Sequence, residues 1–226
     1  NTPFTHVKYS PHSPEGTTTL FVGGQTGRLF KVENADDNSP DVTEITADEF
    51  PVASVSCVAI GGSEDTLLVT FSNYGVASVW QSYDGGQNWT NMEGNLPDMP
   101  VRYALYHPED ARQAMLATEL GIWSCNHMHL PDPQWAPDVD GMANVRTDML
   151  QLREADNTVL AATHGRGLYT TTWTSNPWVS VAELPELPVR NIWPNPVSDN
   201  INIQLDKATD GQLQASLTDM QGRQVY

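Results

Sequence analysis

The sequence predicts an all-β protein, and three observations support this prediction. Its 226 residues include 16 glycines and 16 prolines, a content that favours many turns. No stretch shows the 3.6-residue apolar period of an amphipathic helix. One strand-turn-strand pattern occurs four times, with turn glycines at Gly27, Gly75, Gly121 and Gly167. These glycines are 48, 46 and 46 residues apart, so we expect four copies of one structural unit.

Each repeat contains the strands of one small sheet. The predicted hairpins span residues 19–30, 67–77, 114–124 and 159–170. A strand-like run precedes each hairpin, at residues 6–9, 55–60, 101–106 and 145–152. A short fourth strand is expected at residues 89–92 and 135–136. Because one such sheet cannot cover its own apolar faces, the repeats are expected to stack side by side.

Three or four strands in each repeat of about 46 residues are typical of a β-propeller blade. A β-sandwich could use the same strands, but it would not repeat them as a fixed set, and we therefore favour the propeller. Four blades are fewer than most closed rings contain. The repeats are thus expected to form part of a larger propeller, either with more blades before Asn1 or by association of chains.

The most specific motif follows the hairpin of the second repeat, where residues 82–90 read Ser-Tyr-Asp-Gly-Gly-Gln-Asn-Trp-Thr. An aspartate here can accept hydrogen bonds from turn N–H groups, the glycines permit positive φ, and the tryptophan can pack between sheets. The motif resembles the Asp-box, Ser-x-Asp-x-Gly-x-x-Trp, of the BNR repeats in sialidases, xyloglucanases and sortilin-like propellers. That resemblance implies structural rather than catalytic roles for Ser82, Asp84, Gly86 and Trp89.

The other repeats keep less of this motif. Trp135 follows the turn glycine of the third repeat by 14 residues, as Trp89 does in the second, but residues 127–133 replace the box. The first repeat has neither feature.

The last repeat contains Ala-Thr-His-Gly-Arg-Gly at residues 162–167, which resembles a hairpin in the final blade of sortilin-like and Asp-box propellers. Glycines on both sides of Arg166 permit a tight turn that directs the guanidinium outward. His164 and Arg166 are therefore candidate ligand-binding residues, and the alternative that they only fill a turn stays open.

A change of composition after Trp173 predicts a domain boundary. Pro177, Pro185 and Pro188 indicate a linker over residues 175–190, between propeller blades at 1–174 and a second domain at 191–226. The second domain has Pro-Asn-Pro at 194–196, alternating apolar residues at 201, 203 and 205, and Asp-x-x-Gly-Arg at 219–223. It resembles the C-terminal sorting domain of type IX secretion substrates of Bacteroidetes. The resemblance implies a partial β-sandwich, the secretion machinery as a partner, and a secreted or cell-surface protein.

Charge and cysteine content exclude several classes. The chain carries 11 Lys and Arg against 28 Asp and Glu, a net charge of −17, so nucleic acids and anionic membranes would be repelled. No window approaches 18 apolar residues, and no transmembrane segment is predicted. Cys57 and Cys125 lack the spacing of a zinc site; we expect buried apolar roles, with a disulfide between them left open.

The sequence does not indicate a set of catalytic residues. The arginines 28, 102, 146 and 166 lack the motif of a sialidase triad, and no pair stands out among Glu119, Asp138, Asp140 and Asp148. Imidazole and carboxylate groups of one loop, His127, His129, Asp132, Asp138 and Asp140, could bind a divalent metal, but a solvated loop is the stronger interpretation, so neither metal nor cofactor is predicted.

The predicted function is a secreted or cell-surface propeller that binds a polysaccharide or protein ligand. The alternatives are a glycoside hydrolase of the Asp-box propeller type, with catalytic residues outside this segment, and a mainly structural surface protein.

Overall fold

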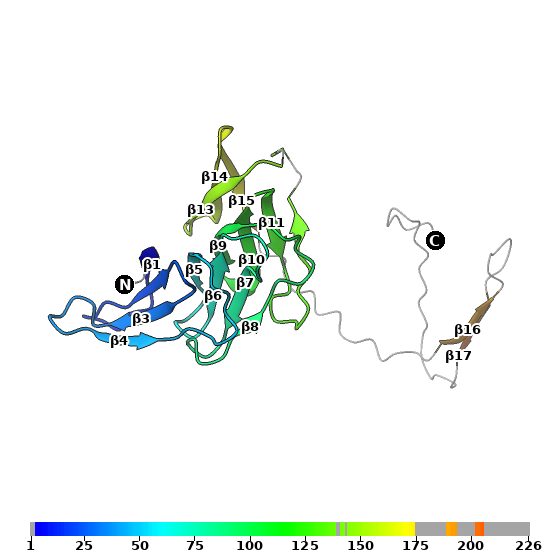
Figure 1. Cartoon of the computed structure of the whole chain (residues 1–226). Coiled ribbons are helices and arrows are strands. Elements are labelled where there is room, and N and C mark those ends of the chain that lie inside the picture. Colours follow the sequence, from blue (N-terminus) through cyan, green and yellow to red (C-terminus); the bar gives the residue numbers. More distant parts are fainter. Residues whose placement is uncertain (1–2, 139–140, 143, 175–188, 194–201, 206–226) are drawn as a thin grey trace. The chain divides into compact units, whose positions relative to one another are not determined.

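The structure is a computed structural model that describes residues 3–138, 141–142 and 144–174, together with the backbone of 189–193 and 202–205. The chain divides into two compact units, Asn1–Asn176 and Pro177–Tyr226, which are described separately (Figure 1). The domain limits expected from the sequence remain a prediction.

The first unit consists of four antiparallel sheets whose strands follow chain order. The first sheet contains β1 (Phe4–Tyr9), β2 (Leu20–Gly24), β3 (Leu29–Glu33) and β4 (Asp41–Glu44). The second contains β5 (Val55–Ile60), β6 (Leu67–Phe71), β7 (Val79–Ser82) and β8 (Thr90–Asn91). The third contains β9 (Val101–His107), β10 (Asp110–Thr118), β11 (Gly121–Cys125) and β12 (Ala136–Pro137). The fourth contains β13 (Thr147–Arg153), β14 (Thr158–Thr163) and β15 (Gly167–Thr172). The described residues form strands, turns and loops and no helix, which confirms the all-β prediction.

Hairpins are present in all four repeats, with their turn glycines in the left-handed region; in the second repeat the returning strand begins at Val79, beyond the predicted span of 67–77. Gly27, Gly75, Gly121 and Gly167 have φ values of 84°, 72°, 96° and 84°. In the third hairpin Thr118 pairs with Gly121, and in the fourth Thr163 pairs with Gly167. A residue with a Cβ atom is strained at such φ values, and the glycines therefore explain why strand direction reverses at the same point of each repeat.

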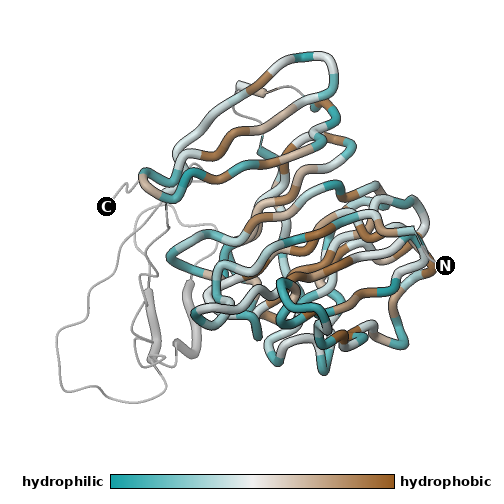
Figure 2. Tube along the Cα trace, turned by 90° about the vertical axis from the view of Figure 1, so that its left-hand side faces the viewer, coloured by the Kyte–Doolittle hydropathy of each residue, from teal (hydrophilic) through white to brown (hydrophobic). Residues whose placement is uncertain are grey.

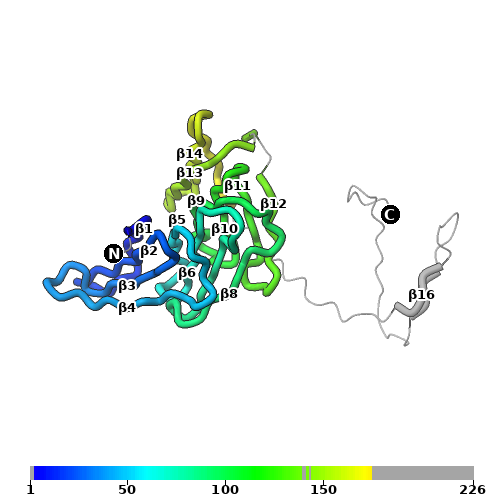
Figure 3. Tube along the Cα trace, in the orientation of Figure 1, coloured from blue at the N-terminus to red at the C-terminus, as the bar shows by residue number. Residues whose placement is uncertain are grey.

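The sheets stack with their first strands side by side. β1 lies next to β5, β5 next to β9, and β9 next to β13 (Figure 3). Apolar side chains fill the three spaces between successive sheets. Figure 2 shows hydrophobic residues mainly along the strands and hydrophilic residues mainly in the loops. The sheets have the arrangement of consecutive propeller blades, with β1, β5, β9 and β13 as the innermost strands.

Two tryptophans, one in the second sheet and one in the third, each connect their sheet to the sheet before it. The indole Nε1 of Trp89 donates to the carbonyl of Ile45, which follows β4, at 3.0 Å. The indole Nε1 of Trp135 donates to the carbonyl of Met92, which follows β8, at 2.9 Å. Trp135 is only 2% exposed. The two side chains are thus equivalent pins between successive sheets.

Both cysteines are buried free thiols in the core between the second and third sheets. Burial raises the pKa of Cys57 to about 12, and its Sγ contacts the carbonyl of Ala104 at 3.6 Å. Cys57 and Cys125 therefore serve as small apolar core residues, and no disulfide joins them.

The second unit has one described hairpin, in which β16 (Val189–Trp193) pairs antiparallel with β17 (Asn202–Leu205). The expected linker prolines, Ile201 and the turn at 219–222 lie outside the described residues. No helix in the described part of the chain is long and apolar enough to cross a membrane.

Candidate functional site

The loop that resembles an Asp-box is held by its own side chains. Ser82 Oγ accepts from the backbone N–H of Gly86 at 2.9 Å and donates to Asp84 Oδ1 at 2.8 Å. The Asp84 carboxylate also accepts from the backbone N–H and the side-chain amide of Asn88, at 2.8 and 2.7 Å. The bonds from Asn88 lower the pKa of Asp84 to about 2. With its acceptor atoms committed to the turn, this carboxylate is suited to structure rather than to proton transfer.

A network of ion pairs lies where the innermost strands of the third and fourth sheets begin. Asp148 is its centre: Oδ1 lies 2.7 Å from Arg146 Nε and 3.7 Å from Arg102 Nε, and Oδ2 lies 3.5 Å from His164 Nδ1. Arg102 also binds Glu119 of the β10–β11 turn. We call these five residues the rim cluster; its carboxylates hold the side chains of two sheets together.

The sequence contained one signal for this cluster. Arg102 and Asp148 are 46 residues apart and each is the second residue of an innermost strand, in β9 and β13. Equivalent residues of successive sheets lie side by side, and an opposite charge at the same position of consecutive repeats therefore indicates an ion pair. Two of the four carboxylates that are catalytic candidates in the sequence, Glu119 and Asp148, share the Arg102 guanidinium.

The two predicted binding residues lie on the β14–β15 turn, His164 as a member of the rim cluster and Arg166 two residues further along the chain. The backbone N–H of His164 donates to the carbonyl of Arg146 at 2.8 Å, and its side chain is 70% exposed. Arg166 is exposed and makes no hydrogen bond or ion pair with any described residue. Gly165 and Gly167, with φ of 83° and 84°, flank it. The cluster together with Arg166 contains three arginines against two carboxylates, a local excess of positive charge in an acidic chain.

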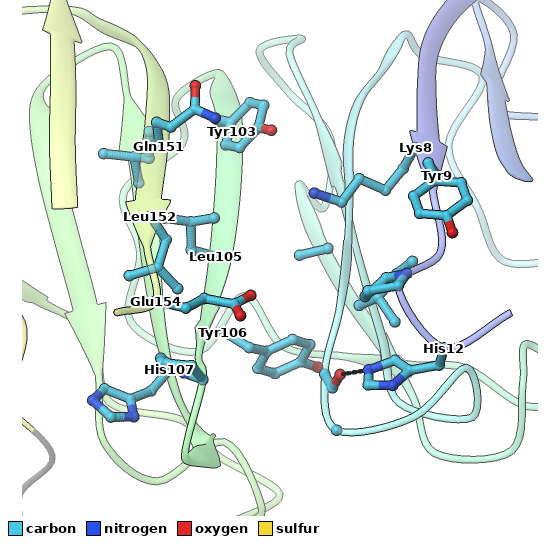
Figure 4. Close-up of a pocket in the computed structure, with 17 residues that line it drawn as sticks. Lys8, Tyr9, His12, Tyr103, Leu105, Tyr106, His107, Gln151, Leu152 and Glu154 are labelled. Atoms are coloured by element: carbon cyan, nitrogen blue, oxygen red, sulfur yellow. Dashed lines mark hydrogen bonds between the residues drawn. The ribbon is translucent and has the colours of Figure 1, made fainter. Parts of the chain in front are cut away.

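A pocket of about 420 Å³ opens between the innermost strands, toward their other ends (Figure 4). One wall comes from β1 and β5 and the other from β9 and β13. Figure 4 shows the Lys8 and Glu154 side chains extending into the space from opposite walls, with Tyr103 and Gln151 above and Leu152 along one wall. We call this space the axial pocket. The sequence did not indicate it, because its residues converge only when four repeats stack.

Five polar groups of the axial pocket have no hydrogen-bond or ion-pair partner among the described residues, whereas His12, Tyr106 and His107 of its lining are hydrogen-bonded. Lys8, Gln151 and Glu154 make no hydrogen bond or ion pair with the described residues, and neither do the hydroxyls of Tyr9 and Tyr103. The set offers an ammonium donor, a carboxylate acceptor, an amide and two phenols. Such an arrangement can form several hydrogen bonds with one bound molecule.

A neutral histidine lies behind the pocket wall. The His6 ring is 6.2 Å from the Tyr103 ring, measured between centroids. Burial, and then the positive charge of Lys8, lower the pKa of His6 to about 4. His6 is therefore uncharged at neutral pH, and Lys8 is the cation of this wall. Among the described residues, no group of three His, Cys, Asp or Glu side chains could hold a metal ion.

Comparison with protein families assigns the tail. Residues 191–226 match the family model described as the secretion system C-terminal sorting domain. The sorting domain is that of type IX secretion, and this chain is accordingly a secreted or cell-surface protein that the secretion machinery recognises through its tail. Among curated protein sequences none matches the chain.

Solved structures confirm the propeller fold. The β-propeller domain of Cps50 (Swd1) from Myceliophteria thermophila is 14% identical with a TM-score of 0.52, covering 77% of this chain and 57% of that one. YCF48 bound to D1 peptide is 14% identical with a TM-score of 0.52, and the match covers 77% of this chain and 52% of that one. Raptor from Chaetomium thermophilum is 11% identical with a TM-score of 0.52, and the match covers 77% of this chain and 17% of that one. The chain therefore spans about half the length of the first two of these structures.

Proposed function

We propose that this secreted propeller segment binds a polysaccharide, and that the axial pocket holds one or two of its sugar rings. The observation that supports the proposal is the set of polar groups in that pocket, Lys8, Gln151, Glu154 and two tyrosine hydroxyls, that have no partner among the residues the structure describes. Its volume lies within the range of about 300–1,000 Å³ usual for ligand sites.

The chemistry of the wall suits a sugar. Hydroxyl groups of a saccharide both donate and accept, which matches the mixed donors and acceptors of Lys8, Gln151 and Glu154. The C–H faces of a sugar ring are apolar and can pack against Tyr103 and Leu152, since a tyrosine presents an apolar ring with a polar end. A purely apolar ligand would leave these polar groups buried without partners, which is unfavourable.

We expect Glu154→Ala and Tyr103→Phe each to weaken polysaccharide binding about 3- to 10-fold, because each removes one or two hydrogen bonds worth about 0.5–1.5 kcal/mol each. A glycan array with the whole chain first selects the polymer, and calorimetry then measures the dissociation constants. Glu49→Gln, an exposed carboxylate outside the pocket, is the matched control and should bind as the native chain does.

Unchanged binding in both pocket variants would show that the polysaccharide binds elsewhere. Release of reducing sugar from the selected polymer would favour the glycoside hydrolase alternative, whose catalytic residues are proposed to lie outside this segment. The kinship with Asp-box propellers and the origin in Bacteroidetes are likewise proposals that rest on the motifs of the sequence.

The rim cluster favours a second candidate function, the binding of an acidic protein ligand through His164 and Arg166. The observation behind it is the exposed Arg166 guanidinium, which has no partner among the described residues and lies next to an excess of arginine. A guanidinium recognises a carboxylate by two parallel hydrogen bonds.

We expect Arg166→Ala to weaken the binding of a poly-glutamate peptide about 3- to 10-fold at low salt, and the difference to shrink as salt screens the charges. Fluorescence anisotropy of a labelled peptide measures this. Arg153→Ala is the control, since Arg153 is 68% exposed but already paired with Asp156 at 2.7 Å. Equal losses in the two variants would argue for a general charge effect and against a site at the β14–β15 turn.

A further inference from the structure

The axial pocket contains one cationic and one anionic side chain, which extend into it from opposite walls. Lys8 lies on β1, and Glu154 directly follows β13 (Figure 4). The described lining of the pocket has no other Lys, Arg, Asp or Glu residue. The Lys8 ammonium and the Glu154 carboxylate form no ion pair with each other, so both charges remain available to a molecule that lies between the walls.

The histidines near the pocket add little to this pair of charges. His107 is uncharged, because its Nδ1 accepts a backbone N–H at 3.2 Å and only an uncharged imidazole offers an acceptor nitrogen. His6 is uncharged at neutral pH, because burial lowers its pKa to about 4. The ring of His12 already binds a backbone carbonyl through Nε2 at 2.9 Å. Lys8 and Glu154 thus set the charge of the pocket, and their two charges sum to zero.

Opposite charges on opposite walls favour a ligand that carries both kinds of charge. A ligand with only a carboxylate is attracted by Lys8 and repelled by Glu154, and a ligand with only an amine meets the reverse. A ligand that carries a carboxylate and an amine can form both ion pairs at once. The net charge of −17 also repels a polyanion at long range, whereas a polymer with balanced charges is not repelled.

We propose that the saccharide bound in the axial pocket is zwitterionic, with a carboxylate that binds Lys8 and an amine that binds Glu154. A disaccharide of a uronic acid and an unacetylated hexosamine has these two groups on neighbouring rings. The inference rests on the proposed polysaccharide function and names the class of sugar that the same pocket binds. Tyr103 and Leu152 favour a sugar over a peptide, because they present apolar surface to the C–H face of a ring.

Four hexasaccharides of equal length test the proposal by calorimetry with the whole chain. De-N-acetylated hyaluronan alternates carboxylates with amines, hyaluronan has only carboxylates, the glucosamine hexamer has only amines, and cellohexaose has neither. At about pH 6 the carboxylates are ionised and the amines are protonated. We expect de-N-acetylated hyaluronan to bind about 3- to 10-fold more tightly than each of the other three at low salt, and the difference to shrink as salt is added.

Charge reversal in the pocket should change which hexasaccharide binds most tightly. Glu154→Lys makes both charges positive, so hyaluronan should become the preferred ligand. Lys8→Glu makes both charges negative, so the glucosamine hexamer should become the preferred ligand. Glu49→Gln, at an exposed carboxylate outside the pocket, is the control and should leave the order of affinities unchanged. Circular dichroism of each variant checks that the chain stays folded.

Several results would overturn the proposal. Equal affinity for all four hexasaccharides, each weakened by Tyr103→Phe, would remove the requirement for two charges but leave the polysaccharide site in place. An order of affinities that is the same in both folded reversal variants would place the charge recognition outside the pocket. Equally tight binding of triglycine, a zwitterionic peptide, would argue against a saccharide. Absence of binding by de-N-acetylated hyaluronan would also contradict the inference, whereas the glycan array decides the proposed function by itself.

Discussion

Replacing Trp135 with alanine is expected to destabilise the first unit by about 3–5 kcal/mol. The side chain is 2% exposed and lies in the core between the second and third sheets. Its removal leaves a cavity and also leaves the Met92 carbonyl without the indole donor. Because neighbouring sheets support one another, the loss at one interface should lower the stability of the sheets on both sides.

Chemical denaturation followed by circular dichroism measures this change. Trp135→Phe keeps a ring but loses the N–H group, so its free energy of unfolding should lie between those of the native chain and the alanine variant. Leu130→Ala, at a side chain that is 45% exposed, is the control and should change the free energy of unfolding by less than about 0.5 kcal/mol. If Trp135→Ala cost no more than Leu130→Ala, Trp135 would not be a pin between sheets.

Gly27→Ala is the second substitution with a large expected effect. It should lower the free energy of unfolding by roughly 3–5 kcal/mol. Two costs add at this turn. The φ of 84° is unfavourable for a residue with a Cβ atom, and a Cβ here would lie 2.3 Å from the backbone carbonyl oxygen of Pro51. Since the obstacle is backbone, it cannot move aside as a flexible side chain could.

The hairpin of the fourth repeat provides a matched control. Gly167 has the same φ of 84°, but a Cβ placed on it would meet nothing within 4 Å. We therefore expect Gly167→Ala to cost only the backbone strain, about 1–2 kcal/mol. Urea denaturation of both variants separates the cost of backbone strain from the cost of the contact with Pro51. Equal losses would mean that the contact with Pro51 contributes nothing.

Much of the fold could be predicted because the repeat places equivalent residues at a fixed interval. The turn glycines and the tryptophans 14 residues after two of them located the hairpins and the interfaces between sheets. The fourth strand of the first sheet, β4, was missed, because that repeat lacks the tryptophan that marked the strand elsewhere.

The candidate sites were harder to predict for a physical reason. A periodic pattern shows which residues are equivalent, but it does not show which ends of four different strands face one space. Lys8 and Glu154 are far apart in the sequence, and only stacking places them on opposite walls of the axial pocket. His164 and Arg166 were found because a turn with two glycines has a local signature, whereas the role of Asp148 depends on three partners from two sheets.

The pins between the sheets have a direction along the chain. Trp89 reaches back to Ile45, and Trp135 reaches back to Met92, so both bind a carbonyl that the ribosome has already made. Each of these two sheets therefore docks through its tryptophan onto a sheet that precedes it in the chain, and the stack has a polarity that runs from its N-terminal to its C-terminal end.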